Sequence, residues 1–181
     1  MGEQSIAANP LEQFVLLAKN AKGAAAVELI KQALEAPAVF VFGELLDMAN
    51  IQVVMVVGVA LLTPVILLPS QDLTNGPHAA YLTILNMFAF GTYKDLTSCS
   101  DPIPDLSPLM RRKLRLLTVV NLAEQSKLLS YSLLMQELHI DNVRELEDLV
   151  IEGISAGVVQ GKLDQKSSHF EVDYVIGRDI R

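Results

Sequence analysis

The sequence contains few of the residues from which chemical sites are built. It has one cysteine, Cys99, three histidines and no tryptophan. A single cysteine excludes an internal disulfide, which fits a reducing compartment. His78, His139 and His169 show no paired spacing such as His-Glu-x-x-His, and one cysteine leaves no zinc-finger pattern. The sequence therefore predicts no catalytic residues, no cofactor-binding residues and no metal ligands, and the chain is not expected to be an enzyme.

Positive charge is also scarce. Lysine and arginine number 14 against 21 aspartates and glutamates, so the formal net charge is −7. An acidic chain of this kind is not expected to bind nucleic acid through a general electrostatic surface. The first residues, Met1–Gln4, do not form a basic segment followed by an apolar run, so a signal peptide is not expected.

The glycines near the carboxyl end do not form a phosphate-binding loop. Such a loop needs four residues between its glycines and a hydroxyl residue after the lysine. Between Gly157 and Gly161 only three residues intervene, and Leu163 follows Lys162. We therefore interpret both glycines as helix stop signals, since glycine adopts the left-handed conformation at low cost.

One long run without charge, residues 51–69, stands apart from the rest of the sequence. Its length approaches that of a membrane-spanning helix, but Pro64 interrupts it and no basic residue closely flanks it. A buried element of the fold is a second interpretation. A third is a segment foreign to the fold, which would favour aggregation. The sequence leaves these three interpretations open.

The amino-terminal half predicts short amphipathic helices. Helices are expected from Pro10, from Val27 to Leu34, over 38–48 and over 78–90, because apolar residues recur there at helical spacing. Short helices with brief connections are typical of an α-solenoid-like stack of helical repeats. We expect residues 1–96 to form this part, with 53–72 as an atypical apolar insertion and 97–107, which holds Pro102 and Pro104, as a linker.

Residues 108–181 predict a winged helix-turn-helix. One helix is expected from Pro108 through Asn121 and a second after Ser130. A third follows Asn142, whose spacing to Glu145 is that of a capping box. Strands at 162–165 and 169–174, joined by a turn, would form a small antiparallel wing of two strands. The fold class is therefore mainly α: helical repeats followed by a winged helix with a β wing.

The charge of the third helix bears on what this winged helix binds. A helix that enters the major groove of DNA needs donors to phosphates and guanine. This helix and its start carry five carboxylates but only one arginine. The carboxylates are Asp141, Glu145, Glu147, Asp148 and Glu152, and the arginine is Arg144. We therefore favour a winged helix that makes protein contacts.

The last strand is the candidate partner site. Its residues alternate between two faces, as in a half-buried antiparallel strand. A strand at the edge of a wing leaves N–H and C=O groups that can pair with a strand of another chain. The candidate partner-binding residues are Phe170, Glu171, Val172, Asp173 and Tyr174.

Several segments resemble the PCI-domain proteins (proteasome lid, COP-nine signalosome, initiation factor three). Within them, the resemblance is to the signalosome's subunit-seven branch, and to its plant versions most of all. The segments cover most of residues 10–50 and 78–181. They are Leu11–Phe14, Leu34–Pro37, Phe42–Leu46, Phe90–Tyr93, Asn142–Leu149, Gly161–Gln165 and Ile176–Asp179.

The resemblance implies a non-catalytic scaffold subunit located in nucleus and cytoplasm. Its partners would be other signalosome subunits through the winged-helix edge, and cullin-RING (SCF) ubiquitin ligases indirectly. The complex removes the ubiquitin-like protein NEDD-eight from cullins and so regulates ubiquitin-dependent degradation and, in plants, photomorphogenesis. In the family this chemistry belongs to a different, zinc-bearing subunit with a His-x-His motif. The alternatives are a nucleic-acid-binding winged-helix regulator and a variant anchored in a membrane through 51–69.

The sequence departs from the family pattern in two places. The run 53–72 has no counterpart in the family, and a retained intron or a gene-model error would explain it. The family also continues past Arg181 into a long helix, which is expected to mediate entry into the helical bundle of the complex. We therefore expect a form with an atypical insertion and a truncated carboxyl end.

Overall fold

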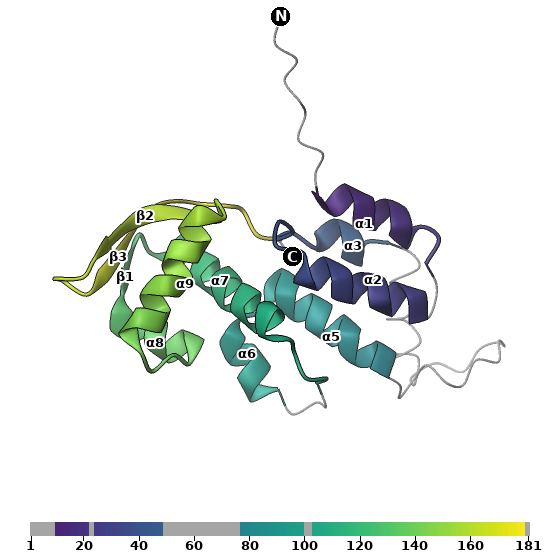
Figure 1. The fold of residues 1–181 in the computed structure, drawn as a ribbon, viewed down its shortest axis with the longest axis horizontal. Helices are drawn as coiled ribbons and strands as arrows, with labels where there is room; N and C mark the ends of the chain where they lie inside the picture. The colour runs from purple at the N-terminus through teal and green to yellow at the C-terminus, as the bar shows by residue number, and fades with distance from the viewer. Residues whose placement is uncertain (1–9, 22–23, 49–76, 100–102, 180–181) are drawn as a thin grey trace, which may run out of the picture.

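A computed structural model describes residues 10–21, 24–48, 77–99 and 103–179. These residues form a mainly helical fold with one small antiparallel sheet, which confirms the predicted fold class. In Figure 1 a stack of helices lies on one side, the sheet with two helices lies on the other, and α7 runs between them. The elements in chain order are α1 Pro10–Ala18, α2 Ala24–Glu35, α3 Gly43–Leu46, α5 Pro77–Phe90, α6 Tyr93–Ser98, α7 Pro108–Gln125, β1 Leu128–Ser130, α8 Tyr131–Leu138, α9 Val143–Ser155, β2 Val159–Asp164 and β3 His169–Val175.

The helices α1, α2 and α5 lie side by side and form the amino-terminal stack. The expected helix over 38–48 is wrong in extent, because only Gly43–Leu46 is helical. Before it, residues 39–42 form no helix or strand, and Val39 and Phe42 both reach the core. The ring of Phe42 meets that of Phe88 edge-on at a centroid distance of 6.0 Å, a favourable arrangement of two aromatic rings.

The expected linker is partly structured. Helix α6 extends to Ser98 and begins with a capping box, in which the Thr92 hydroxyl accepts from the Asp95 N–H and the Asp95 carboxylate accepts from the Thr92 N–H. Leu106 is buried in the amino-terminal core, and the Ser107 hydroxyl accepts from the Met110 N–H to cap α7. Residues 103–107 therefore hold α7 against the stack.

Helix α7 contributes to two hydrophobic cores. Leu114 and Leu117 belong to the core of the amino-terminal stack, whereas Leu116 and Val119 belong to the core of the winged helix. Leu109, near the start of the helix, enters neither core and is 64% exposed. The two cores therefore meet in α7, and not at residues 97–107.

The caps of α8 and α9 agree with the sequence in part. The Ser130 hydroxyl accepts from the Leu133 N–H at the start of α8, as predicted. Asn142 caps α9 through the Arg144 N–H at 2.9 Å and not through Glu145, so the predicted capping box is wrong. The Glu145 carboxylate instead accepts from Arg115, whose charge attracts it more strongly than a backbone N–H would.

The sheet of the winged helix has three strands in the order β1-β3-β2, not the two expected. The unforeseen strand is β1, in which Leu129 lies opposite Phe170. In β2, Leu163 also lies opposite Phe170, and the strand begins at Val159 rather than at Lys162. Strand β3 therefore occupies the centre of the sheet.

Of the two predicted stop glycines, only Gly157 ends α9, with a φ of 72°. Gly161 lies inside β2, where a Cβ would stand 2.2 Å from the Glu171 carbonyl oxygen, so the strands can approach this closely only at glycine. The ladder is irregular between Gln160 and Gly161. Beyond the irregularity the alternation of β3 changes phase, and Tyr174 is 56% exposed instead of facing the core.

The apolar run 51–69 and the insertion 53–72 lie outside the described residues, so the three interpretations of that run are untested. Among the described helices, none combines the length and the apolar character that crossing a bilayer requires.

Candidate partner-binding surface

The central position of β3 changes where the wing can pair with another chain. Strand β1 bonds to one side of β3 and β2 to the other. Phe170 and Val172 are buried, and Glu171 has a partner residue in each neighbouring strand. The prediction of an open edge is therefore wrong for Phe170–Val172, because β1 occupies the side that a two-stranded wing leaves open there, whereas Asp173 and Tyr174 have no partner residue in β1.

The longer edge of the sheet is β2. In an antiparallel strand, the backbone groups of successive residues point alternately to the two sides. The Val172 N–H donates to the Lys127 carbonyl on the β1 side at 2.8 Å, so the backbone groups of Glu171 point toward Lys162 in β2. The next residue in β2, Leu163, therefore directs its N–H and C=O away from β3, as an edge strand does before it pairs with another strand.

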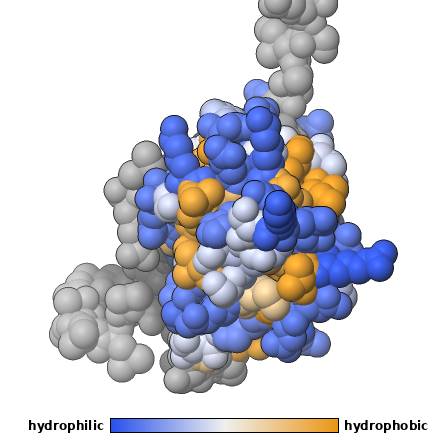
Figure 2. Space-filling model, turned by 90° about the vertical axis from the view of Figure 1, so that its left-hand side faces the viewer, coloured by the Kyte–Doolittle hydropathy of each residue, from blue (hydrophilic) through white to orange (hydrophobic). Residues whose placement is uncertain are grey.

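Exposed apolar side chains surround the wing. Leu128 on β1 is 58% exposed, and Tyr174 on β3 and Ile151 on α9 are similarly open. Figure 2 shows this end of the molecule, where hydrophobic residues form separate patches among hydrophilic ones. Such a mixture of apolar and polar surface is typical of interfaces between proteins.

Intramolecular contacts engage much of the acidic face of α9. The Glu145 carboxylate accepts from Arg115 at 2.8 Å, and Glu152 pairs with Arg112. The Tyr131 hydroxyl donates to Glu147, and burial together with this carboxylate raises the pKa of Tyr131 to about 12. Three of the carboxylates that the sequence placed on this helix therefore have partners within the chain.

The histidines do not gather into a site. The backbone of His139 is left-handed and ends α8, and its ring lies 5.9 Å from that of Tyr93. His169 pairs with Ser130 and Asp164 in the sheet, and the side chain of His78 lies outside the described ones. In the part of the chain that the structure describes, no three His, Cys, Asp or Glu side chains are placed to hold a metal ion.

Arg178 and Asp179, which follow β3, connect the winged helix to the amino-terminal stack. Beyond the sheet the chain returns to α3 (Figure 1). The Asp179 carboxylate accepts from the N–H groups of Phe42 at 2.6 Å and Gly43 at 2.9 Å, at the start of α3. The Arg178 guanidinium donates to the carbonyls of Phe88 and Gly91, both at 2.9 Å, at the end of α5. We call Arg178 and Asp179 the clasp.

The clasp matches the charge of each residue to a helix end. A carboxylate is favourable at a helix amino terminus and a cation at a carboxyl terminus, where unpaired backbone groups carry partial charges. Burial lowers the pKa of Arg178, while Glu124 and Asp179 oppose that shift. Our sequence reasoning matched Ile176–Asp179 to the family but did not foresee this contact. The glycine at position 43 was a possible sign of a close contact there, because a Cβ at this position would stand 2.7 Å from the Asp179 carboxylate.

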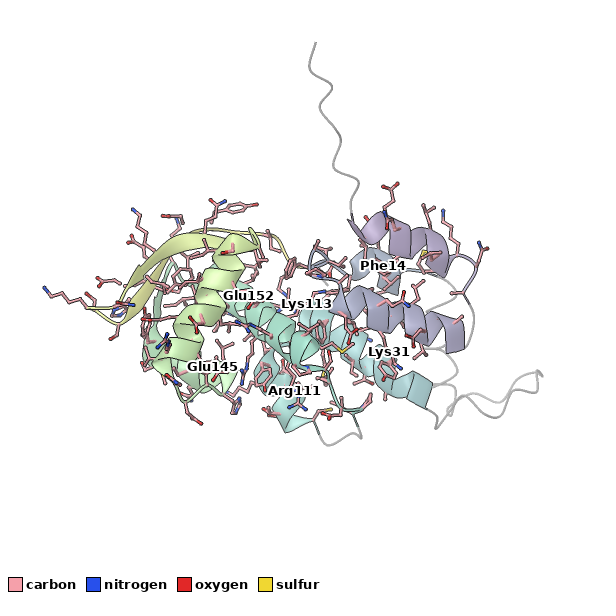
Figure 3. All side chains as sticks on the ribbon, in the orientation of Figure 1. Phe14, Lys31, Arg111, Lys113, Glu145 and Glu152 are labelled. Atoms are coloured by element: carbon pink, nitrogen blue, oxygen red, sulfur yellow. The ribbon has the colours of Figure 1, made fainter. Side chains whose placement is uncertain are left out.

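A buried lysine joins α7 to α2. The Lys113 ammonium donates to the carbonyls of Ala33, Leu34 and Ala36 at 2.8 to 3.2 Å, at the end of α2. Figure 3 shows Lys113 where α7 meets the stack. Its nitrogen also lies 5.1 Å from the centre of the Phe42 ring, within the range of a cation–π contact. Burial lowers the pKa of Lys113 to about 7.

The fold and this surface define a class of protein. A helical stack leads through a shared helix into a winged helix with exposed strand edges. This is the architecture of a PCI domain, and the family model described as the PCI domain matches residues 91–173. A second family model, described as the CSN7 helical bundle subdomain, matches residues 12–43. The chain belongs to the COP9 signalosome subunit 7 family.

Curated relatives named as this subunit are similar to nearly the whole chain. COP9 signalosome complex subunit 7 of Dictyostelium discoideum is 43% identical over 96% of this chain and 60% of its own length. Subunit 7a of Mus musculus is 45% identical over 94% of this chain and 55% of its own length. Subunit 7 of Arabidopsis thaliana is 38% identical over 94% of this chain and 59% of its own length. The chain thus spans about three fifths of these relatives or slightly less, and the greater similarity to the first two does not support the expected preference for plant versions.

Proposed function

We propose that this chain is a non-catalytic scaffold subunit of the COP9 signalosome. Its direct partners are other signalosome subunits, and it supports the removal of the ubiquitin-like NEDD-eight protein from cullin-RING ligases, which it meets through the complex. The observation that carries the proposal is the similarity to subunit 7 across both the helical stack and the winged helix. The expected locations, nucleus and cytoplasm, belong to the same proposal, and imaging of the tagged chain would test them.

The winged-helix contact is expected at β2. Its edge supports this contact in two ways: Leu163 directs backbone groups outward, and the strand is twice as long as β1, with six residues against three. Pairing with a strand of a neighbouring subunit would satisfy these groups and extend the sheet by one strand. The partner-binding edge therefore moves from β3, where the sequence indicated it, to Val159–Asp164.

Co-expression of the chain with the other subunits, followed by capture of the complex, tests both parts of this proposal. Leu163→Pro removes an outward N–H while the bonds of Lys162 and Asp164 to β3 remain possible. We expect this variant to be depleted from the captured complex, and Lys166→Ala, in the exposed turn, to be retained. Circular dichroism verifies that both variants fold.

Two outcomes would contradict different parts of the proposal. Failure of the unchanged chain to enter the complex would contradict the scaffold function itself. Equal capture of the folded Leu163→Pro variant would leave the scaffold function standing and contradict the contact at β2.

A further inference from the structure

A groove between α7 and α9 gathers arginines on a chain whose net charge is negative. It has a volume of about 560 Å³, and its charged lining consists of four arginines and two carboxylates, although the chain as a whole carries −7. Arg111 on α7 and Glu145 on α9 come from the two helices that border it (Figure 3). The lining arginines are Arg111, Arg112, Arg115 and Arg144.

Helical spacing gathers three of these arginines. Arg115 follows Arg112 by three positions and Arg111 by four, so it neighbours both of them on the surface of α7. Arg144 joins them from the first turn of α9. Leu109, on the same face of α7, is 64% exposed beside them and adds an apolar contact.

The groove already binds carboxylates from its own chain. Arg115 donates to Glu145 at 2.8 Å, Arg112 pairs with Glu152, and Arg111 pairs with Asp105. The arginine and carboxylate of the last two pairs are more than two fifths exposed. Exposed pairs of this kind contribute little stability, so a second carboxylate can exchange with the first.

Arg144 differs from the other three arginines of the groove. Among the described residues, Arg144 is in no ion pair, while the other three arginines each have a carboxylate partner. A guanidinium presents donors in a planar fork that matches a carboxylate. We propose that this groove binds an acidic peptide segment of a partner protein, with Arg144 and Arg111 donating to its carboxylates and Leu109 contacting an apolar side chain.

Nucleic acid fits the groove less well. Its lining carboxylates, Glu145 and Asp148, stand beside Arg144 and would repel a continuous phosphate backbone. A peptide can place separate carboxylates at the arginines and an apolar residue between them. The site lies at the start of α9, whereas β2 follows its end, so this inference does not depend on the wing contact.

Fluorescence anisotropy with the purified chain tests the proposal. The probes are a labelled peptide of alternating Glu and Asp around one Leu, the same peptide with Gln and Asn, and labelled single- and double-stranded DNA. We expect the acidic peptide to bind, and the double variant Arg111→Ala/Arg144→Ala to weaken it about tenfold. The matched control Lys127→Ala/Lys166→Ala changes the net charge equally outside the groove and is expected to leave binding unchanged.

Four outcomes would overturn the proposal: no binding of the acidic peptide, equal binding of the neutral peptide, an equal loss in both double variants, or tighter binding of DNA than of the peptide. Both substituted arginines are exposed, and circular dichroism confirms that each variant folds.

Discussion

At the scale of single residues, two charged groups hold the parts of the molecule together. Lys113 reaches from α7 to the end of α2, and Asp179 reaches from beyond β3 to the start of α3. Each side chain satisfies backbone groups that a helix end leaves without partners. Sequence periodicity did not predict either contact. Such a contact depends on which helix ends meet in space, and the spacing of apolar residues does not encode this.

Replacing Asp179 is expected to destabilise the fold. Asp179→Ala removes the acceptor of two backbone N–H groups, so the free energy of unfolding should fall by about 1 to 3 kcal/mol. Urea unfolding measures this change. Asp141→Ala, at an exposed position before α9, is the matched control and should change stability by about 0.5 kcal/mol at most. A loss no larger than that of the control would mean that the clasp contributes no stability.

Lys113 predicts a pH dependence of stability. Burial lowers its pKa from 10.5 to about 7 in the folded chain. Between these values the unfolded chain binds more protons than the folded chain, so this group makes stability rise as the pH increases through that window. The urea midpoint of the unchanged chain, relative to that of Lys113→Met, should therefore rise between about pH 7 and about pH 9.

The variant Lys166→Met controls for general charge effects, because it removes the same charge at an exposed position. A flat difference between the unchanged chain and Lys113→Met would mean that Lys113 stays charged. In that case the three carbonyls and the Phe42 ring outweigh the cost of burial.

At the scale of elements, long helices with clear caps were predictable and short elements were not. Pro10, Pro108 and Ser130 indicated three helix starts that the structure confirms. Strand β1 has three residues, too few for an alternating pattern, and it forms because β3 offers it a partner distant in sequence. Helix α6 did have a signal, since Thr92 and Asp95 have capping-box spacing, and our prediction overlooked it.

The candidate site was predictable to the level of the wing and no further. The alternation of 169–174 indicated a strand with Phe170, Val172 and Tyr174 on one face, and of these Phe170 and Val172 are buried while Tyr174 is exposed. Whether that strand lies at an edge depends on β1, so the sequence alone placed the edge on β3 instead of β2. The clasp and the arginine groove depend in the same way on tertiary contacts between distant segments.

Gly161 is expected to be required for the geometry of β2. In Gly161→Val, the Cβ would collide with the Glu171 carbonyl and approach the Phe170 ring to 2.9 Å, so β2 must separate from β3. We expect a loss of about 2 to 4 kcal/mol in the free energy of unfolding, as for other severe steric conflicts. Gly177→Val is the control, because nothing lies within 4 Å of a Cβ at that position. Equal stability of the two variants in urea would show that the strands can separate without cost.

At the scale of the whole molecule, α7 makes the helical stack and the winged helix one structural unit. Its two faces enter both cores, and Lys113 and the clasp add polar contacts between the parts. A partner bound at the wing therefore meets an edge whose position relative to the stack is fixed. This rigidity suits the proposed scaffold function, because it would set the direction in which a neighbouring subunit follows.

Hydrogen exchange of the backbone amides in β2 tests the proposed assembly most directly. The exchange is compared between the free chain and the chain assembled with the other signalosome subunits. Pairing of Val159–Asp164 with a neighbouring strand should slow exchange of the outward Leu163 amide, because that N–H would then be hydrogen-bonded. Assembly of the complex with unchanged exchange at Leu163 would contradict the account.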